Sequence, residues 1–246
     1  MKDSDSDRLY ASPRLSIAGF AFNHAVVAVF PDMIKRSVPG YETIVAMTGT
    51  LARRFVRPHT HCYDLGCSLG ASLLAMAAAT SDRPRHLVGV DNSAPMIERC
   101  QEILQRECLA TDAELLCEDI ATVPIANASM VALNFTLQFI PLEQRQALLA
   151  KIFAGLNPGG VLVLSEKVAF GDEDHNRLMI DLHHDFKRAN GYSDLEISQK
   201  RSALDNVLIP ETLEAHRQRL REVGFASVDV WFQCFNFASL IAIRGE

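Results

Sequence analysis

The amino-acid sequence predicts an α/β fold in which a mostly parallel, seven-stranded sheet carries helices on both faces. Short apolar runs alternate with helix-forming stretches from residue 60 to residue 167, and repeated strand–helix units of this kind place their strands side by side in one sheet. Two β-rich runs that lie close together end the chain. We interpret residues 1–246 as one domain, because the length suits a single core and no long linker divides it.

The elements of the alternating part follow from periodicity and from residues typical of helix ends. Strands are predicted over 60–66, 86–91, 113–119, 128–135 and 161–167. Helices are predicted over 71–80, from Asn92 onward with Ser93 as the N-cap, and over 141–160, where Asn157-Pro158-Gly159-Gly160 closes an amphipathic pattern.

The alternation stops after Lys167. Residues 172–206 are predicted to be helical throughout, as a helical insertion, and a further helix is predicted over 210–225. The β-rich runs 226–235 and 236–245 are near enough in sequence to pair antiparallel at the far end of the sheet. The last strand is therefore expected to run against the others.

Charge and hydropathy narrow the class of protein. The formal net charge of −6 argues against direct binding to nucleic acid, which depends on clustered Lys and Arg. No apolar run approaches a membrane span, and the start, MKDSDSDRLY, is acidic where a secretory signal would be basic and then apolar. We expect a cytoplasmic protein with no membrane partner and a flexible tail over residues 1–8.

The cysteines indicate no metal site. The 6 cysteines include no CxxC pair. His59, His61, Cys62 and Cys67 are the nearest approach to a zinc ligand set. Alternation along a strand would point His61 and Cys62 to opposite faces, so we expect no metal.

The stretch CYDLGCSLG, residues 62–70, permits two interpretations. Its second half matches the G-x-S-x-G nucleophile elbow of esterases, with Ser68 as the nucleophile. An esterase also needs a glycine-rich oxyanion loop upstream and Asp and His partners downstream. No glycine cluster precedes residue 62, and the histidines at 183, 184 and 216 have no context that marks them as partners.

The second interpretation of this stretch is a glycine-rich loop that holds a ligand after the first strand. Asp91 ends the next strand about 20 residues after Gly70, which is the usual spacing of a ribose-binding acid. Asp64 precedes the loop, and two acids suit a nucleoside with a cationic amino-acid tail better than one with a pyrophosphate. We therefore interpret Ser68 as a ligand-contacting loop residue.

Several motifs resemble known families in order and spacing. DLGCSLG, VDNSAPMIERC, EDI and NFTLQF are similar to the cofactor motifs of class I S-adenosylmethionine-dependent methyltransferases, which have a Rossmann-like fold. Ser68 stands where those enzymes usually have a glycine. VFPDMIKRSVPGY, LNFTLQFIPLEQRQALL, HHDFKRANGYSDLEISQKRS and WFQCFNF resemble the carboxy-S-adenosyl-L-methionine synthases. The similarity covers nearly the whole chain, from about Arg8 to Arg244.

The resemblance implies an activity and partners. It implies conversion of S-adenosyl-L-methionine and prephenate to carboxy-S-adenosyl-L-methionine and phenylpyruvate, without a metal and in a homodimer. The product would supply a separate enzyme that carboxymethylates hydroxylated wobble uridine in tRNA. Two alternatives stay open: a methyltransferase acting on a small acidic molecule, and a non-catalytic module that binds S-adenosylmethionine.

The resemblance also implies roles for individual residues. Those expected to hold S-adenosylmethionine are Asp91 and Asn92 at the ribose, Gly66, Cys67 and Ser68 at the methionine portion, Asp119 and Ile120 at the adenine, and Asn134 in the crevice. The alternative for Asn134 is a strand-end cap.

Two residues are expected to act in the reaction itself. Tyr41 follows the turn SVPG, which would place its hydroxyl over the site, and Arg201 would meet the new carboxylate bidentately. Arg201 is expected to serve its own subunit or the neighbouring one. Arg188 and Lys200 are further candidates for the carboxylates of prephenate, whereas the paired histidines 183 and 184 are interpreted as structural.

Overall fold

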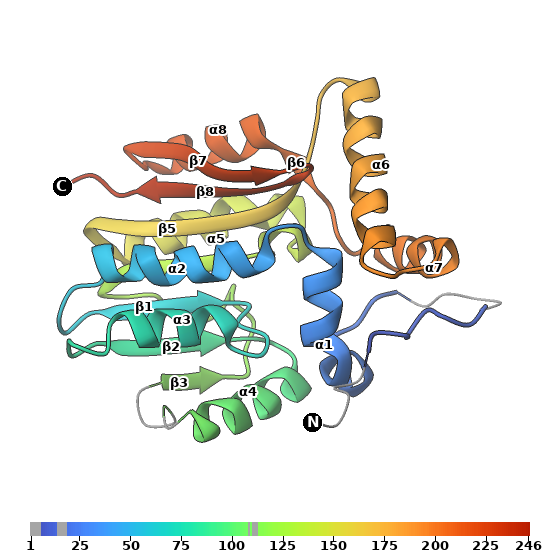
Figure 1. The fold of residues 1–246 in the computed structure, drawn as a ribbon. Coiled ribbons are helices and arrows are strands. Elements are labelled where there is room, and N and C mark those ends of the chain that lie inside the picture. The colour runs from blue at the N-terminus through green and yellow to red at the C-terminus, as the bar shows by residue number, and fades with distance from the viewer. Residues whose placement is uncertain (1–5, 14–18, 108, 110–112) are drawn as a thin grey trace.

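The computed structural model describes residues 6–13, 19–107, 109 and 113–246. Its centre is a sheet of eight strands with the order β3-β2-β1-β4-β5-β8-β7, and β6 pairs with β5 off this path (Figure 1). The strands are β1 (His61–Leu65), β2 (His86–Val90), β3 (Ala113–Leu116), β4 (Ala128–Asn134), β5 (Leu156–Ala169), β6 (Glu211–Thr212), β7 (Ser227–Cys234) and β8 (Phe237–Ile243). The seven predicted strands are all present, and β6 is a two-residue addition.

The directions of the strands agree with the predicted mostly parallel sheet. The pairs β1–β2, β1–β4, β2–β3 and β4–β5 are parallel. Strand β8 runs antiparallel to both β5 and β7. Strand order reverses at β1, which lies between β2 and β4. Ligands of open α/β sheets bind at such a point, outside the carboxyl ends of the strands.

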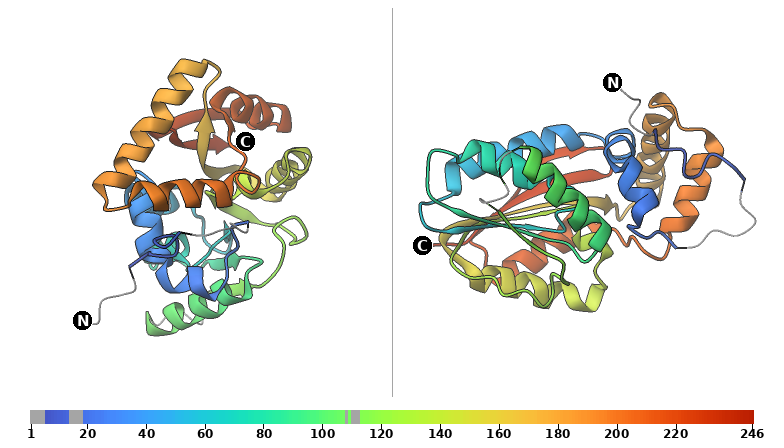
Figure 2. Two further views of the ribbon diagram at one scale, coloured as in Figure 1. Left: turned by 90° about the vertical axis from the view of Figure 1, so that its right-hand side faces the viewer. Right: turned by 90° about the horizontal axis from the view of Figure 1, so that it is seen from below.

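Helices cover both faces of the sheet (Figure 2). Helices α2 (Tyr41–Phe55), α3 (Ala71–Ala79) and α4 (Ala94–Arg106) lie on one face, and α5 (Leu142–Gly155) and α8 (Leu213–Val223) lie on the other. Each face has its own buried apolar cluster, centred on Leu73 and Met130 on the first and on Leu133 and Leu149 on the second. Burial of these side chains is the main favourable term in the stability of such a layered fold.

The remaining helices gather at the carboxyl ends of the parallel strands. They are α1 (His24–Ser37), α6 (Glu173–Ala189), α7 (Asp194–Leu204) and the short 3₁₀ helix η1 (Leu137–Phe139). No element is predicted before residue 60, so α1 and α2 are additions to the predicted elements. Asn23 caps α1 by accepting a hydrogen bond from the Val26 amide at 3.2 Å.

Two predicted helix boundaries were wrong. The segment 172–206 is not one helix, because Gly191 adopts a φ of +86° and the Ser193–Glu196 capping box begins a second one. The helix predicted over 141–160 ends at Gly155. A Cβ at Gly155 would lie 2.3 Å from the Ile125 carbonyl oxygen, so this glycine packs the helix end against the chain, and Asn157 to Gly160 belong to β5.

The structure also differs from the flexible tail expected over 1–8. Residues 1–5 lie outside the described residues, but Asp7 is 2% exposed and packs against α1. Over the part of the chain that the structure describes, no helix combines the length and apolar character needed to cross a bilayer.

Candidate active site

A cavity of about 720 Å³ lies at the carboxyl ends of β1, β2 and β4, and residues of α1, α6 and α7 contribute to its lining. Its lining includes all the residues expected to hold S-adenosylmethionine or to act in the reaction itself: Tyr41, Gly66, Cys67, Ser68, Asp91, Asn92, Asp119, Ile120, Asn134 and Arg201. The fold thus brings these residues together around one space. Their individual contacts with a ligand stay predictions.

The loop after β1 is held close to the second strand. The amides of Gly66 and Cys67 both donate to the carbonyl oxygen of Val90, at 2.7 and 2.9 Å. Gly66 has a φ of +81°, and a Cβ there would lie 2.2 Å from the Thr136 hydroxyl oxygen. Only glycine fits this position, because both the backbone conformation and the space exclude a side chain. The close approach brings the loop backbone to the cavity wall.

Ser68 belongs to this loop. Its φ is +48°, and its amide donates to the Asp91 carboxylate at 2.9 Å. Across the described residues, no hydrogen bond joins the Ser68 hydroxyl to a histidine. The arrangement supports the interpretation of Ser68 as a loop residue rather than a nucleophile.

Asp91 is oriented by two backbone amides. The Ser68 amide donates to one carboxylate oxygen and the Ser93 amide to the other, each at 2.9 Å. Burial raises the pKa of Asp91, and these two hydrogen bonds oppose that effect. Each oxygen keeps a free lone pair, which is what two ribose hydroxyls require.

Asp64 brings a second acid to the same half of the cavity. It is 2% exposed and accepts a hydrogen bond from the Leu73 amide at 3.1 Å. Burial raises its pKa to about 7, and the nearby Asp91 adds to this. A cationic ligand would stabilise the ionised form of both acids.

On the side of the cavity predicted to contact adenine, a lysine that no sequence motif indicated holds the loop. Lys151 donates to the carbonyl oxygens of Ile120 and Val123, at 2.6 and 2.8 Å. The Asp119 carboxylate accepts from the Ala121 amide at 2.8 Å and is exposed at the cavity. Lys151 lies on the outer part of an amphipathic helix, so its local pattern is that of an ordinary surface lysine.

Asn134 is largely committed to protein partners. Its amide nitrogen donates to the Ser72 and Thr48 hydroxyls at 3.0 and 3.3 Å, and its oxygen accepts from Ser165 at 2.6 Å. One lone pair of the amide oxygen stays open to a ligand. Asn134 therefore joins the end of β4 to α2, α3 and β5, which agrees with the alternative of a strand-end cap.

Tyr41 is the first residue of α2 and faces the cavity. It follows Gly40, whose φ is +77°. Burial, and secondly the charge of Asp64, raises the pKa of Tyr41. In the described part of the chain no hydrogen bond engages its hydroxyl, which is therefore available to a ligand.

The other half of the cavity is rich in cations. Strand β5 and helices α6 and α7 contribute Lys167, His183, His184, Lys187, Lys200 and Arg201 to its lining. Burial, and then repulsion from Lys167, lowers the pKa of Lys187 to about 7. Burial lowers the pKa of Lys200 to about 8. Lys187 and Lys200 are buried, and Asp205 in the same lining faces Lys167. Buried cations are favourable only when anions neutralise them.

The paired histidines, which the sequence analysis interpreted as structural, line the same half. His183 Nε2 lies 2.8 Å from the Ser37 carbonyl oxygen, so this nitrogen carries the proton. Burial and the charge of Lys187 lower the pKa of His183 to about 2 and that of His184 to about 4. Both imidazoles are therefore neutral at neutral pH.

The two arginine candidates for substrate carboxylates lie in different places. Arg201 is exposed at the cavity, and no ion pair engages it within the described residues. Arg188 instead pairs with Asp185 and Asp194, at 2.7 and 2.8 Å, outside the cavity lining. Arg188 was thus a wrong candidate for substrate carboxylates, whereas Lys200 lies at the cavity.

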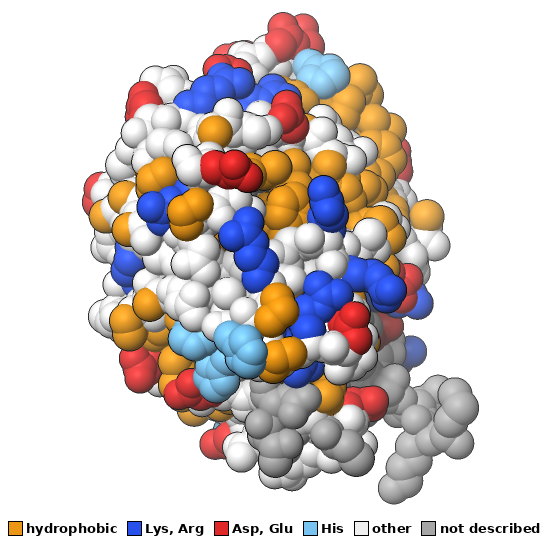
Figure 3. All heavy atoms as spheres, turned by 90° about the vertical axis from the view of Figure 1, so that its left-hand side faces the viewer, with side chains coloured by type: hydrophobic (Ala, Val, Ile, Leu, Met, Phe, Trp, Pro, Cys, Tyr) orange, Lys and Arg blue, Asp and Glu red, His pale blue; other side chains and the backbone are white. Residues whose placement is uncertain are grey.

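The four residues considered as zinc ligands, His59, His61, Cys62 and Cys67, do not form one cluster. Figure 3 views the amino-terminal ends of the parallel strands, where histidine side chains gather on the surface. His61 and His86 lie there with ring centroids 5.1 Å apart, whereas Cys62 is buried. Among the described residues, no group of three or more His, Cys, Asp or Glu side chains is arranged to hold a metal ion.

Solved structures show the same fold. An O-methyltransferase family protein from Burkholderia thailandensis superposes with a TM-score of 0.64 at 17% identity, covering 89% of this chain and 59% of that one. Human N-acetylserotonin methyltransferase in complex with SAM gives a TM-score of 0.60 at 15% identity, covering 91% and 56%.

Sequence comparison identifies the family. Residues 63–160 match the model of a methyltransferase domain. A carboxy-S-adenosyl-L-methionine synthase from Trichlorobacter lovleyi is 58% identical, covering 97% of this chain and 98% of that relative. One from Aliivibrio fischeri is 52% identical over 98% of this chain and 100% of its own length. Identity at this level over whole chains shows that the protein belongs to the carboxy-S-adenosyl-L-methionine synthase family.

Proposed function

We propose that the protein is a transferase of a one-carbon group that converts S-adenosyl-L-methionine and prephenate to carboxy-S-adenosyl-L-methionine and phenylpyruvate. The observation that carries the proposal is the charge division of one cavity. Asp64, Asp91 and Asp119 line one half, and three lysines and Arg201 line the other, where Asp205 is also present. The first half suits a cationic sulfonium nucleoside, and the second suits a dicarboxylate.

The residues present fit S-adenosylmethionine as a substrate. Asp91 and Asn92 would bind the ribose, and the Gly66–Ser68 backbone would lie against the methionine portion. Asp119 and Ile120 would contact the adenine. The restricted space at Gly66 and the free lone pairs of Asp91 support these assignments.

The cationic half would bind prephenate and the newly formed carboxylate. Arg201 has a guanidinium free for a bidentate pair, which a lysine cannot form. Lys187 and Lys200 would neutralise the two carboxylates of prephenate. Anion binding would in turn hold these lysines in their charged form. The Tyr41 hydroxyl would complete the wall between the two halves.

The reaction needs no protein nucleophile. Prephenate loses carbon dioxide and its ring hydroxide as the ring becomes aromatic, which supplies the driving force. The hydroxide takes a proton from the methyl group, which the sulfonium acidifies, and water forms. The resulting ylide carbon bonds to the carbon dioxide. The protein would hold both reactants close together and exclude water, effects that can lower a barrier by several kcal/mol.

The wider setting is proposed on the same basis. The product would serve wobble-uridine modification of tRNA in the cytoplasm, with no direct contact between this protein and tRNA, as its charge of −6 suggests. A single domain of residues 1–246 would act as a homodimer. The exposed Leu178 on α6 and Leu195 on α7 support self-association through the insertion.

Mass spectrometry of the small-molecule products tests the proposal. Purified protein is incubated with S-adenosylmethionine, with and without prephenate. The expected result is a prephenate-dependent species in which a carboxyl replaces a hydrogen of S-adenosylmethionine, formed together with phenylpyruvate. Formation of S-adenosylhomocysteine alone would favour the methyltransferase alternative. Tight S-adenosylmethionine binding without any product would favour the binding module.

A further inference from the structure

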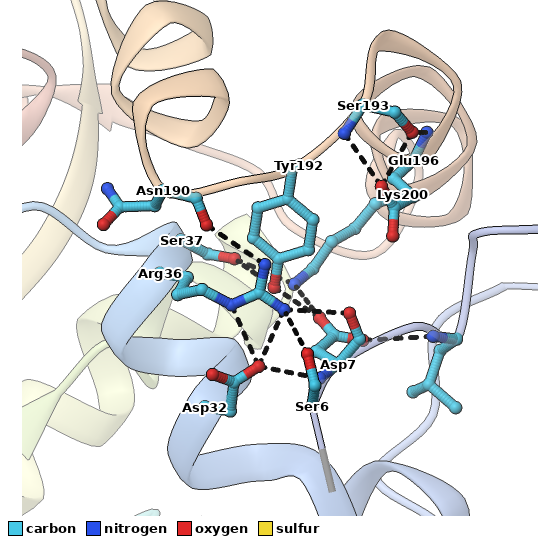
Figure 4. Close-up of polar contacts among 11 residues, drawn as sticks. Ser6, Asp7, Asp32, Arg36, Ser37, Asn190, Tyr192, Ser193, Glu196 and Lys200 are labelled. Atoms are coloured by element: carbon cyan, nitrogen blue, oxygen red, sulfur yellow. Dashed lines mark hydrogen bonds and ion pairs between the residues drawn. The ribbon is translucent and has the colours of Figure 1, made fainter.

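The N-terminal segment 6–12 lies beside α1, and Figure 4 shows Asp7 close to Asp32 and Arg36 on one side and to Tyr192 and Lys200 on the other. Its central residue, Asp7, is 2% exposed. The Asp7 amide donates to the Asp32 carboxylate at 2.7 Å, and the Arg36 guanidinium donates to the Asp7 carbonyl oxygen at 2.9 Å. These bonds attach the segment to α1.

The same segment is also attached to α7. The Gln199 side chain donates to the carbonyl oxygens of Tyr10 and Ser12, at 2.8 and 3.0 Å. The Asp7 carboxylate accepts from the Tyr192 hydroxyl at 2.5 Å and lies 3.5 Å from the Lys200 ammonium. The segment therefore joins α1 to the helix that carries Lys200 and Arg201.

A short series of contacts leads from Asp7 to the cavity. The Lys200 ammonium donates to the Ser37 hydroxyl at 3.0 Å. The Ser37 carbonyl oxygen accepts from His183 at 2.8 Å. Ser37, His183 and Lys200 all line the cavity. A carboxylate outside the cavity lining thus lies 3.5 Å from a cation on the cavity wall.

The charges around Lys200 make Asp7 its main counter-charge. Asp7 faces it from the N-terminal segment, Asp32 and Arg36 from α1, and Lys187 from α6. The Tyr192 ring lies 5.5 Å from the ammonium. Asp32 is itself paired with Arg36 at 2.7 Å. Burial lowers the pKa of Lys200 to about 8, and Asp7 opposes this more than any other neighbour does.

We propose that Asp7 is a positioning residue for the anionic substrate. It keeps Lys200 charged and its ammonium against Ser37, and so it holds α7 and Arg201 at the cavity wall. The inference rests on the proposed function in that the anion is taken to be prephenate. On this proposal the N-terminal segment contributes to the binding of prephenate and does not contribute to the binding of S-adenosylmethionine.

Kinetics of Asp7→Asn in the full-length protein test the inference. We expect the KM for prephenate to rise about tenfold or more, as for loss of one partner of a buried charge pair. The Kd for S-adenosylmethionine, from isothermal titration calorimetry, should change less than about twofold. Asp7→Glu should restore much of the affinity for prephenate.

The pH profile separates this role from a merely structural one. Lys200 must be charged to act, so activity falls as pH rises through its pKa. Without Asp7 that pKa is lower, and the alkaline limb of kcat/KM for prephenate should move to lower pH. The matched control is Asp194→Asn, which removes the same charge from an exposed site on α7 that pairs with Arg188.

A readout independent of turnover keeps the test decisive. The titration of Lys200 can be followed by NMR of carbon-labelled lysines, assigned with Lys200→Arg. In Asp7→Asn the midpoint should move to lower pH. If it stays in place, or if prephenate and S-adenosylmethionine affinities fall together without a shifted limb, the inference is overturned. A wild-type protein that forms no prephenate-dependent product contradicts the proposed function instead, and the Lys200 titration still decides the effect of Asp7.

Discussion

The backbone amide of Ser68 donates a 2.9 Å hydrogen bond to the carboxylate of Asp91. Ser68 stands where related loops usually have a glycine, and this hydrogen bond joins it to Asp91, the acid proposed to bind the ribose. The bond comes from the backbone, so it does not depend on the serine hydroxyl. This relationship leads to the first prediction.

Ser68→Gly and Ser68→Ala should both retain formation of carboxy-S-adenosyl-L-methionine. Glycine accepts the φ of +48° without strain, whereas alanine carries the same left-handed strain, about 1 kcal/mol, that the wild-type serine already has. Turnover measured by mass spectrometry should stay within about fivefold of wild type, less than the hundredfold scale of a lost catalytic group. Near-complete loss of turnover in Ser68→Ala, with the melting temperature kept, would contradict the loop interpretation.

Arg201→Lys should raise the KM for prephenate or lower kcat while leaving the Kd for S-adenosylmethionine unchanged. A lysine keeps the charge but cannot form the bidentate pair, and such losses are worth about 1.5–3 kcal/mol. Steady-state kinetics and calorimetry measure the two effects. Arg188→Lys is the matched control, because Arg188 is engaged by Asp185 and Asp194.

Mixing Arg201→Ala subunits with Asp91→Asn subunits should show which subunit Arg201 serves. If Arg201 reaches the neighbouring site, the mixture recovers activity, because some dimers then hold one intact site. Turnover of the mixture is compared with that of each variant alone. No recovery, in mixtures shown by mass spectrometry to contain mixed dimers, would place Arg201 in its own site.

The affinity for prephenate should fall as pH rises from about 7 to 9. Burial and Lys167 lower the pKa of Lys187 to about 7, and burial lowers the pKa of Lys200 to about 8, so both charges are lost over this range. The free energy of unfolding should change in the opposite direction. The unfolded chain binds more protons there, so stability gains from these groups as pH rises. Titration calorimetry and urea unfolding at each pH measure the two trends.

Lys187→Arg offers a direct check on that prediction. An arginine stays charged, so the alkaline loss of prephenate affinity should be weaker. The exposed Lys35, which pairs with Glu42, provides the control Lys35→Arg. An unchanged pH profile in Lys187→Arg would assign the titration to another group.

Lys151→Met should weaken S-adenosylmethionine binding with little effect on the KM for prephenate. The substitution removes the donor to the Ile120 and Val123 carbonyl oxygens, which hold the loop at the adenine side. Each lost hydrogen bond to a charged group is worth about 1.5–3 kcal/mol, part of which appears as reduced stability. Calorimetry measures the loss of S-adenosylmethionine affinity, and thermal unfolding measures the loss of stability. Equal losses for both substrates would contradict a role confined to the adenine loop.

Local sequence patterns were sufficient for the sheet and for the acidic half of the site. The apolar run 86–91 and the loop 66–70 are each a contiguous stretch of sequence, so local patterns suffice to recognise them. The carboxyl ends of parallel strands meet at one edge of the sheet, so Asp91 and Asn134 could be placed at that edge without long-range information. Helix ends that depend on packing against distant residues were not predicted. Helix α5 ends at Gly155 because a side chain there would collide with the backbone at Ile125, and no local sequence pattern indicates this contact.

By itself the sequence determined the order of the strands and helices from residue 60 to residue 167, the glycine-rich loop 66–70, and the acids at the carboxyl edge of the sheet. Only the tertiary structure decided that Lys167 and Lys187 join Lys200 and Arg201 at the cavity, and where Asp7 lies. Lys167, Lys187 and Lys200 lie on three elements, and each has the local pattern of a surface lysine. They converge because α6 and α7 pack with α1 over the sheet. Asp7 joins them because burying those charges requires a counter-charge, and the N-terminal segment supplies it across 193 residues of sequence, from position 7 to position 200.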